Sequence, residues 1–549
     1  LNPIAAVVIT LIVFLAFLRF GSTLMANLVI VASAVITVGT MAASGVPFYV
    51  ITNALPVILI GIAVADSIHI YSEYFERRAL HPQESIETSV VASMVEMWRP
   101  ITLTTLTTAA GFLGLSFAAY MPPFQFFGLF TGLGVSVAWL YSLIVLPAAM
   151  SLMKTEVHPR LANRIRTEGH DRFARVMVTL GNRVQHNAKT IVSLFAIAAV
   201  LSAVAASQLR VDEDRIETFH SSEPLYQADK VINSHFDGTN YLDIVVAASE
   251  AEGIFEPATL RKMEALQQYA QTLPWVQGSA SVVDYLKQMN RALNEGDPQQ
   301  YSLPTDKELV AQYFLLYSAS GEPTDFEEEV DYEYRLANIR VSLNNGAFSD
   351  NRVVVEKLDR YLQDHFNDAQ VSATLSGRVN LNYHWIKDLG ASHFTGMAIA
   401  LFLAWLVSAL LFRSAMAGIF ALTPVAASIL LVYSAMVALS IPLGIGTSMF
   451  AAVAIGLGVD FAIHTIDKLR SLHPESGDIP TTLQKFYPTT GRALLFNLLA
   501  IAFGFGVLIS SKVVPLNNFG IIVALSVTTS FLASMTLLPA MILLFKPRF

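Results

Sequence analysis

Long apolar runs separated by short polar loops dominate the chain of 549 residues. An α-helix needs roughly 20 apolar residues to cross the hydrocarbon core of a bilayer. We predict eleven such spans, at residues 3–18, 22–43, 50–72, 100–119, 124–153, 190–207, 392–411, 415–438, 446–466, 493–511 and 518–545. The pattern therefore predicts a mainly α-helical membrane protein.

One long polar segment, residues 208–390, interrupts these runs. Alternating apolar residues predict strands, and apolar residues three and four apart predict helices. Strands are expected at 241–247, 336–343 and 370–375, and helices at 257–273, 282–293 and 349–366. Ser349 is the expected N-cap of the last helix, because a serine oxygen accepts from the free amides of a helix start. The order strand, helix, strand between residues 336 and 375 predicts a split βαβ unit.

Composition narrows the functional classes. Hydrophobic residues make up 54% of the chain and charged residues only 14%, which is outside the range of a soluble domain. The chain has no cysteine, so disulfides and thiolate metal sites are excluded. No phosphate-binding P-loop sequence and no Ser, His and Asp order stands out, so we expect no enzyme and no cofactor. Any transport must then draw on an ion gradient.

The distribution of charge predicts the orientation. Basic residues gather in the short loops of one side, such as Arg19, the pair Arg77 and Arg78, and the segment 154–189. Basic loops mark the cytoplasmic side, so the C-terminus is expected there and the polar segment on the opposite side. That segment carries 15 basic and 30 acidic residues, a net charge of 15 − 30 = −15. Such an acidic domain argues against nucleic acid or an anionic membrane surface as a partner.

The chain also repeats itself. The sequence GIAVADSIH at 61–69 aligns with GLGVDFAIH at 456–464, an offset of 456 − 61 = 395. The same alignment pairs Arg99 with Arg492, Gly128 with Gly520 and Pro147 with Pro539. Two copies of a five-span bundle are therefore expected.

This repeat defines the expected domains. The first bundle covers residues 1–153, a cytoplasmic amphipathic linker covers 154–189, and the first span of the second repeat covers 190–207. The extracytoplasmic α/β domain covers 208–390, and the second bundle covers 391–549. By symmetry the first bundle should also follow a span and a domain, so we infer a twelve-span parent with roughly 200 more residues before Leu1.

Each repeat places an acid at membrane depth, Asp66 in the first and Asp460 in the second. A charged side chain there costs a few kcal/mol and marks a functional site by default. One interpretation is a proton relay, in which protonation changes the preferred packing of the helices. The other is a structural hydrogen bond between helices. The two acids differ by one residue in register, or about 100° around a helix, so they need not be equivalent.

A histidine follows each acid at the same repeat position, His69 and His464. Imidazole titrates near neutral pH and can pass protons, although a polar residue satisfied by backbone or water is an equal alternative. A metal site is not expected, because the chain has no cysteine and no HExxH pair. On the facing helices, Thr104 and its counterpart Asn497 are the candidate hydrogen-bond partners of the acids.

Small residues accompany both motifs. Gly61 and Ala63 precede Asp66, and Gly456 and Gly458 precede Asp460. Small side chains let helix backbones approach closely in membranes. We expect these four residues to act in helix packing.

The paired motifs, the repeat and the inserted domain together resemble the resistance, nodulation and division (RND) transporter superfamily. Within it the chain is most similar to the branch of mycobacterial membrane protein large (MMPL), hopanoid exporters and Patched. Two features depart from that pattern: no Lys lies beside the acids, and Ser67 and Phe461 stand where Tyr often follows the Asp.

The resemblance implies a multi-pass transporter of the bacterial inner membrane, with its extra domain in the periplasm. It further implies that the proton-motive force drives export of a lipid or other hydrophobic substrate to the periplasm. A periplasmic carrier and a homo-oligomer are possible partners on the same basis. Two alternatives stay open: a sterol- or lipid-sensing receptor without turnover, and an auxiliary of protein secretion.

Overall fold

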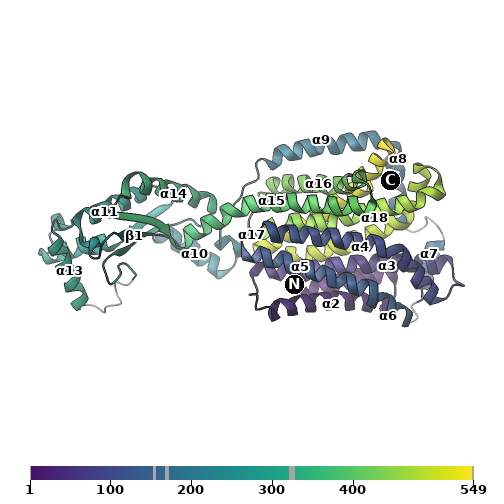
Figure 1. Ribbon diagram of the computed structural model, residues 1–549, viewed down its shortest axis with the longest axis horizontal. Coiled ribbons are helices and arrows are strands. Elements are labelled where there is room, and N and C mark those ends of the chain that lie inside the picture. Colours follow the sequence, from purple (N-terminus) through teal and green to yellow (C-terminus); the bar gives the residue numbers. More distant parts are fainter. Residues whose placement is uncertain (1, 153–155, 167–171, 321–327, 547–549) are drawn as a thin grey trace. The chain divides into compact units, whose positions relative to one another are not determined.

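The structure is a computed structural model that describes residues 2–152, 156–166, 172–320 and 328–546 (Figure 1). The chain forms two compact units. The first unit is a helical bundle made of Leu1–Arg210 and Leu389–Phe549, and the second unit is Val211–Asp388. The predicted boundary positions 208 and 390 lie within three residues of this division.

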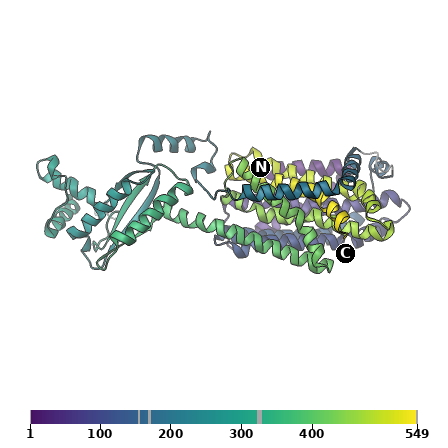
Figure 2. The same ribbon diagram turned by 90° about the horizontal axis from the view of Figure 1, so that it is seen from above.

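The long helices of the bundle run along one common direction (Figures 1 and 2). The first half contains α1 (Asn2–Phe17), α2 (Phe20–Ala43), α3 (Leu55–Leu80), α4 (Ile86–Ala118), α5 (Pro122–Leu140) and α6 (Leu146–Leu152). The second half contains α9 (Ala188–Ala206), α15 (Gly377–Phe412), α16 (Ala415–Ala438), α17 (Ile445–Ser448), α18 (Phe450–Ser476), α19 (Ile479–Phe486), α20 (Arg492–Gly506), α21 (Val514–Met535) and α22 (Leu537–Phe545).

Ten helical segments of the described residues are long and apolar enough to cross a membrane. The eleventh predicted span is the shorter apolar helix Pro3–Phe17. Several segments extend well beyond the apolar runs: the span predicted at 50–72 belongs to the helical segment Val50–Leu80. The fold class expected from the sequence, a mainly α membrane protein with a small α/β part, is confirmed.

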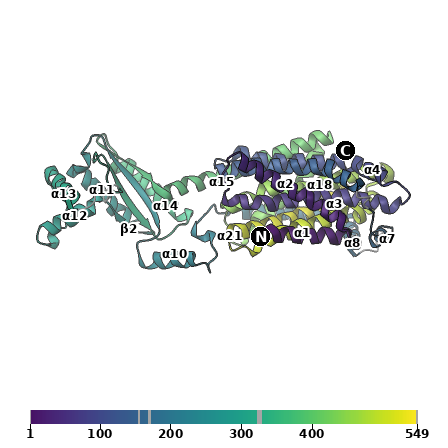
Figure 3. The ribbon, with the colours of Figure 1, turned by 90° about the horizontal axis from the view of Figure 1, so that it is seen from below.

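The helices that carry the two motifs form the centre of the bundle. In the spans that contain α3 and α18, 89% and 100% of the residues in the apolar 18-residue window are buried, against 11% in α9 and 33% in α2. The halves also interlock, because α3 packs against α20 and α18 packs against α4. Figure 3 shows the purple helices of the first half within one bundle with the green and yellow helices of the second half. Each motif helix therefore contacts the other half of the protein, and its polar residues are kept away from lipid.

The predicted linker consists of two helices, α7 (Pro159–Arg166) and α8 (Arg172–His186); residues 154, 155 and 167–171 lie outside the described residues. α7 packs against α3 of the first half. α8 packs on the second half, where the ring of Phe173 lies 5.1 Å from the ring of Phe496. The apolar face of α8 is thus turned at least partly toward protein.

The second unit is built on a four-stranded antiparallel sheet in the order β2-β3-β1-β4. Its elements are α10 (Pro224–His235), β1 (Asn240–Ala248), α11 (Pro257–Gln271), β2 (Val276–Ala280), α12 (Val282–Leu293), α13 (Lys307–Ser320), β3 (Leu336–Leu343), α14 (Phe348–Tyr361) and β4 (Val371–Ser376). The predicted split βαβ unit is β3-α14-β4, with β1 inserted between its strands. A second split unit, β1-α11-β2, holds β3 in the same way.

The predicted N-cap of α14 was wrong. The helix begins at Phe348 after Ala347, so Ser349 lies inside its first turn. The amide and hydroxyl groups of Ser349 instead donate to the Asp212 carboxylate, over 3.0 and 2.7 Å. An acid distant in sequence thus satisfies the helix start, where the helix dipole favours a negative charge.

A pH dependence is expected two residues further on, at Asp214. Burial raises the pKa of Asp214 to about 6, whereas an unfolded Asp titrates near about 3.9. The folded state therefore binds this proton more tightly, and the stability it contributes is lost as the pH rises from about 4 through about 6. At neutral pH the ionised Asp214 therefore lowers the free energy of unfolding. Asp214→Asn should raise that free energy by up to about 3 kcal/mol.

Hydrogen exchange of the β1 and α14 amides in the full chain, corrected for intrinsic rates, measures this effect. We expect slower exchange in Asp214→Asn than in the wild type at pH 7.5, and equal exchange near pH 4. Asp364→Asn, a change at an exposed position of the same unit, is the control. A constant difference between Asp214→Asn and wild type at both pH values would contradict the assignment.

Candidate functional site

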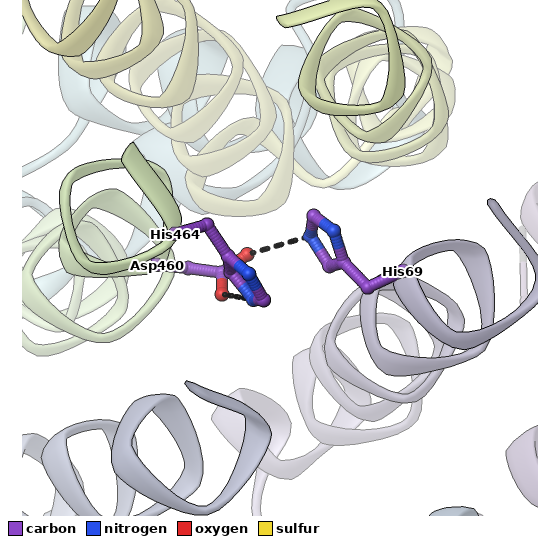
Figure 4. Close-up of side chains that lie close together, drawn as sticks. All are labelled: His69, Asp460 and His464. Atoms are coloured by element: carbon purple, nitrogen blue, oxygen red, sulfur yellow. Dashed lines mark ion pairs between the residues drawn. The ribbon is translucent and has the colours of Figure 1, made fainter. Parts of the chain in front are cut away.

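The two motif helices bring three ionisable side chains into one cluster, which we call the His-Asp-His cluster: His69, Asp460 and His464. His69 projects from α3, and Asp460 and His464 lie one turn apart on α18. Residues four apart share a helix face, so α18 presents both of its groups together. His69 completes the cluster from the other half of the protein (Figure 4).

The Asp460 carboxylate approaches both imidazoles at their Nε2 atoms. Its Oδ1 is 3.3 Å from His464 Nε2, and its Oδ2 is 3.7 Å from His69 Nε2. The two rings are stacked, with centroids 3.8 Å apart and an interplanar angle of 14°. Asn497 on α20 donates through Nδ2 to Asp460 Oδ2 over 3.0 Å. Groups from both halves therefore meet at one carboxylate.

The cluster is almost fully buried. His69 and His464 are 4% exposed, Asp460 is 6% exposed and Asn497 is 0% exposed. A buried carboxylate is stable only if it is paired or protonated. Because its partners are titratable imidazoles, the charge of Asp460 depends on proton binding within the cluster.

Asp66 lies outside the cluster. Its carboxyl group is buried beside the Ser142 hydroxyl, without the geometry of a hydrogen bond. Ser142 belongs to the π-helical turn Tyr141–Val145 between α5 and α6, a local distortion that is frequent at functional sites. The structure thus places the two acids in different surroundings, as their one-residue difference in register predicts.

The structure places the two candidate hydrogen-bond partners differently. Asn497 contacts Asp460 directly, and its Nδ2 lies 3.4 Å from His69 Nε2. The Thr104 hydroxyl donates to the Ile101 carbonyl of its own helix over 2.9 Å, and not to an acid. The threonine of α4 that reaches α18 is Thr108, which donates to the Gly456 carbonyl over 3.0 Å. The sequence could not have predicted this contact, because Thr108 is one of several threonines in this part of α4 and no local feature distinguishes it.

The four small residues lie at close helix contacts. A Cβ atom on Gly456 would stand 2.9 Å from the Thr108 methyl group, and one on Gly458 would stand 2.7 Å from the Ser530 hydroxyl. A Cβ atom on Gly61 would approach the Phe505 ring to 3.3 Å. Ala63 is 0% exposed. Larger side chains at these positions would separate the helices that position the His-Asp-His cluster.

A cavity of about 310 Å³ borders the cluster. Its lining includes His69 and His464 and, one turn further along their helices, Glu73 and Lys468. Lys468 pairs with Glu73 over 3.4 Å and donates a hydrogen bond to Glu96 on α4. These charged residues were not predicted as part of the site, because they lie just outside the apolar runs 50–72, 100–119 and 446–466.

Lys468→Met is expected to destabilise the bundle by about 3 kcal/mol, because it leaves two acids without their cation. The side chains of Lys468 and Glu73 are only 17% and 18% exposed, so solvent compensates little. Thermal unfolding of the detergent-solubilised protein measures the effect. Lys485→Met, at an exposed position of α19, is the matched control, and the double variant with Glu73→Gln should recover part of the loss. Equal unfolding temperatures for Lys468→Met and Lys485→Met would rule out a structural role for the pair of Lys468 and Glu73.

Comparison with known proteins agrees with this architecture. The profile of the MMPL family matches residues 336–548, which include Asp460 and His464. Residues 336–548 are thus MMPL-like, and the chain is a membrane protein. The profile of the sterol-sensing domain of SREBP cleavage-activation matches residues 16–166, which include Asp66 and His69. The two matches thus fall on the two halves of the protein, and each contains one motif helix.

A distant relative supports the same class. A membrane protein of Methanocaldococcus jannaschii is 20% identical over 357 residues, which cover 63% of this chain and 88% of the relative. The MMPL family is a family of transporters, so this protein is transporter-like and not a classical enzyme. Its functional residues are therefore sought in the bundle.

Proposed function

We propose that this protein is a proton-motive-force-driven exporter of a lipid or other hydrophobic substrate, with the His-Asp-His cluster as its proton relay. The observation that carries the proposal is the contact between His69 of the first half and Asp460 of the second. Asp460 lies where the two halves of the bundle pack together. A proton that binds to its carboxylate therefore changes how the halves attract each other.

The coupling follows from electrostatics. With Asp460 ionised, a protonated imidazole on either side attracts the carboxylate, and His69 does so across the two halves. A proton on Asp460 removes this attraction, so the two protonation states favour different packings. A proton gradient then drives the protein between them, which is the requirement of secondary transport.

The cavity supplies a path for protons. It connects the His pair to Glu73, Glu96 and Lys468, at the end of the bundle where Arg77 and Arg99 also lie. Basic residues mark the cytoplasmic side, so this route leads to the cytoplasm of the inner membrane. The α/β unit then lies in the periplasm, where a carrier that accepts the substrate would act.

A second candidate function is a sterol- or lipid-sensing receptor, which the sterol-sensing match at residues 16–166 favours. Such a protein binds lipid within the bundle without transporting protons. Its buried acids would then serve as hydrogen bonds between helices.

A proteoliposome assay separates these functions. Full-length protein is reconstituted with a pH-sensitive dye inside the vesicles, and a pH gradient is imposed with and without added membrane lipid. Proton flux that rises with lipid supports export, whereas lipid binding without flux supports the sensor. Flux that responds to a translocating polypeptide but not to lipid supports a secretion auxiliary and overturns the export proposal.

A further inference from the structure

We propose that His69, Asp460 and His464 form a binding site for a divalent transition metal of the Zn²⁺ class. Their candidate ligand atoms all lie within 4.8 Å of one another. Two imidazole nitrogens and one carboxylate oxygen are a ligand set that zinc prefers. This metal site uses the same three side chains as the proposed proton relay. A metal and a proton compete for the same lone pairs, so the two cannot be bound at once.

The three side chains place their ligand atoms near one another, although not yet at the separations of a bound metal. Tetrahedral Zn²⁺ with bonds of roughly 2.0 to 2.2 Å holds its ligand atoms about 3.4 Å apart. The carboxylate oxygens of Asp460 lie 3.3 Å from His464 Nε2 and 3.7 Å from His69 Nε2. Both imidazoles already direct Nε2 toward the same carboxylate (Figure 4). Because the three candidate ligand atoms are separated by up to 4.8 Å and the two rings are stacked, binding requires shifts of about an ångström and a rotation of at least one imidazole.

Unsatisfied polar atoms at the site strengthen this assignment. The buried His464 Nε2 has no partner with hydrogen-bond geometry, and neither has the buried Asn497 Oδ1. Buried polar groups are usually paired, so each exception calls for an explanation. A bound metal would satisfy His464 Nε2, and a rotation of the Asn497 amide, whose Nδ2 now lies 3.4 Å from His69 Nε2, would turn Oδ1 toward the metal that this nitrogen holds. Asn497 or water would be the fourth ligand.

Charge and access also favour a cation. The Asp460 carboxylate supplies one of the two negative charges that balance a divalent ion. The cavity reaches both histidines and is lined by four acids, Glu73, Glu76, Glu96 and Asp467, and by three bases, Arg99, Lys468 and Arg470. The small excess of acids favours cations over anions along this route. Zn²⁺ therefore has a path to the cluster from the end of the bundle that carries these acids.

The sequence did not predict this site, because no linear metal motif exists: one ligand comes from α3 and two from α18. A metal there would bridge the two halves of the bundle. We expect the bound metal to hold the two halves in one packing and so to inhibit proton flux. The expected inhibition rests on the proposed function. The expected binding of the metal is independent of that function.

Isothermal titration of the purified, metal-free full chain with Zn²⁺ tests the binding. We expect one tight site per chain that is weakened about 100-fold or more in His69→Ala and in His464→Ala, and about 10- to 100-fold in Asn497→Ala, as for residues that support a metal ligand set. Co²⁺ as a probe should show the absorption of tetrahedral coordination. Mg²⁺, which prefers oxygen ligands, should not bind.

Matched controls keep the result interpretable. His473→Ala changes a histidine on the same helix α18, outside the cluster, and should bind Zn²⁺ as the wild type does. Asp460→Asn preserves side-chain volume and should also lose the tight site, which guards against misfolding of the alanine variants. Tight Zn²⁺ binding that persists in His69→Ala and His464→Ala would overturn the proposal. If binding is lost in these variants but Zn²⁺ leaves the proton flux of the wild type unchanged, the metal site stands and the relay does not.

Discussion

Asp460→Asn is expected to reduce lipid-stimulated proton flux by about 100-fold or more, the scale of effect seen when a positioned proton-transfer group is removed. The amide has nearly the volume of the acid, and its oxygen still accepts from Asn497 Nδ2. It cannot bind and release a proton, and it cannot pair with a charged His69 or His464. The change therefore removes the titration and leaves the packing in place.

Two comparisons sharpen this prediction. Asp66→Asn should reduce the flux less, because Asp66 lies beside Ser142 and outside the His-Asp-His cluster. Asp478→Asn should leave it unchanged, because Asp478 only caps α19 through a bond from the Thr481 amide, which asparagine also provides. The same proteoliposome assay measures all three. Unimpaired flux in Asp460→Asn, with loss in Asp66→Asn, would move the relay to the first half.

Gly128→Ala is expected to destabilise the bundle by about 2 kcal/mol or more, the cost of overfilling a packed core. A methyl group on Gly128 would overlap the Phe112 carbonyl oxygen and approach the Ser116 backbone nitrogen to 2.9 Å. Backbone atoms cannot rotate away, so α4 and α5 would have to separate. α4 carries Thr108, which holds α18 beside the cluster.

The repeat supplies a parallel test. Gly520, the counterpart of Gly128, would place a Cβ atom 2.9 Å from the Phe505 carbonyl oxygen, so Gly520→Ala should be destabilising as well. A Cβ atom on Gly39 in α2 meets nothing within 4 Å, and Gly39→Ala should leave the stability unchanged or slightly higher. Thermal unfolding in detergent ranks the variants. Equal unfolding temperatures for Gly39→Ala and Gly128→Ala would show that the helices adjust freely.

The boundaries of the spans show the limit of hydropathy. Apolar runs identify the part of a helix that crosses the hydrocarbon core of the membrane, because only that part must be apolar. The span predicted at 50–72 continues to Leu80 in the structure. Its charged end is held by a contact that no local pattern contains, between Glu73 and Lys468 of the other half.

In the second unit, strands and helices with clear periodicity were predicted within a few residues of their observed bounds. Helices α10 and α13 and strand β2 (Val276–Ala280) were not predicted. The short β2 sequence VQGSA has no run of alternating apolar residues. It exists because it pairs with β3. The cap of α14 was mistaken for the same reason, since Asp212 reaches it from far along the chain.

The sequence by itself determined the membrane class, the repeat and the buried acids, because hydrophobicity and repetition are local properties of the chain. It also aligned His69 with His464. Only the tertiary structure decided that both histidines meet at Asp460, with Asn497 as a further partner. The physical reason is geometric: one residue of register turns a side chain about 100° around its helix. Helix packing between the halves then decides which acid faces the cluster and which faces Ser142.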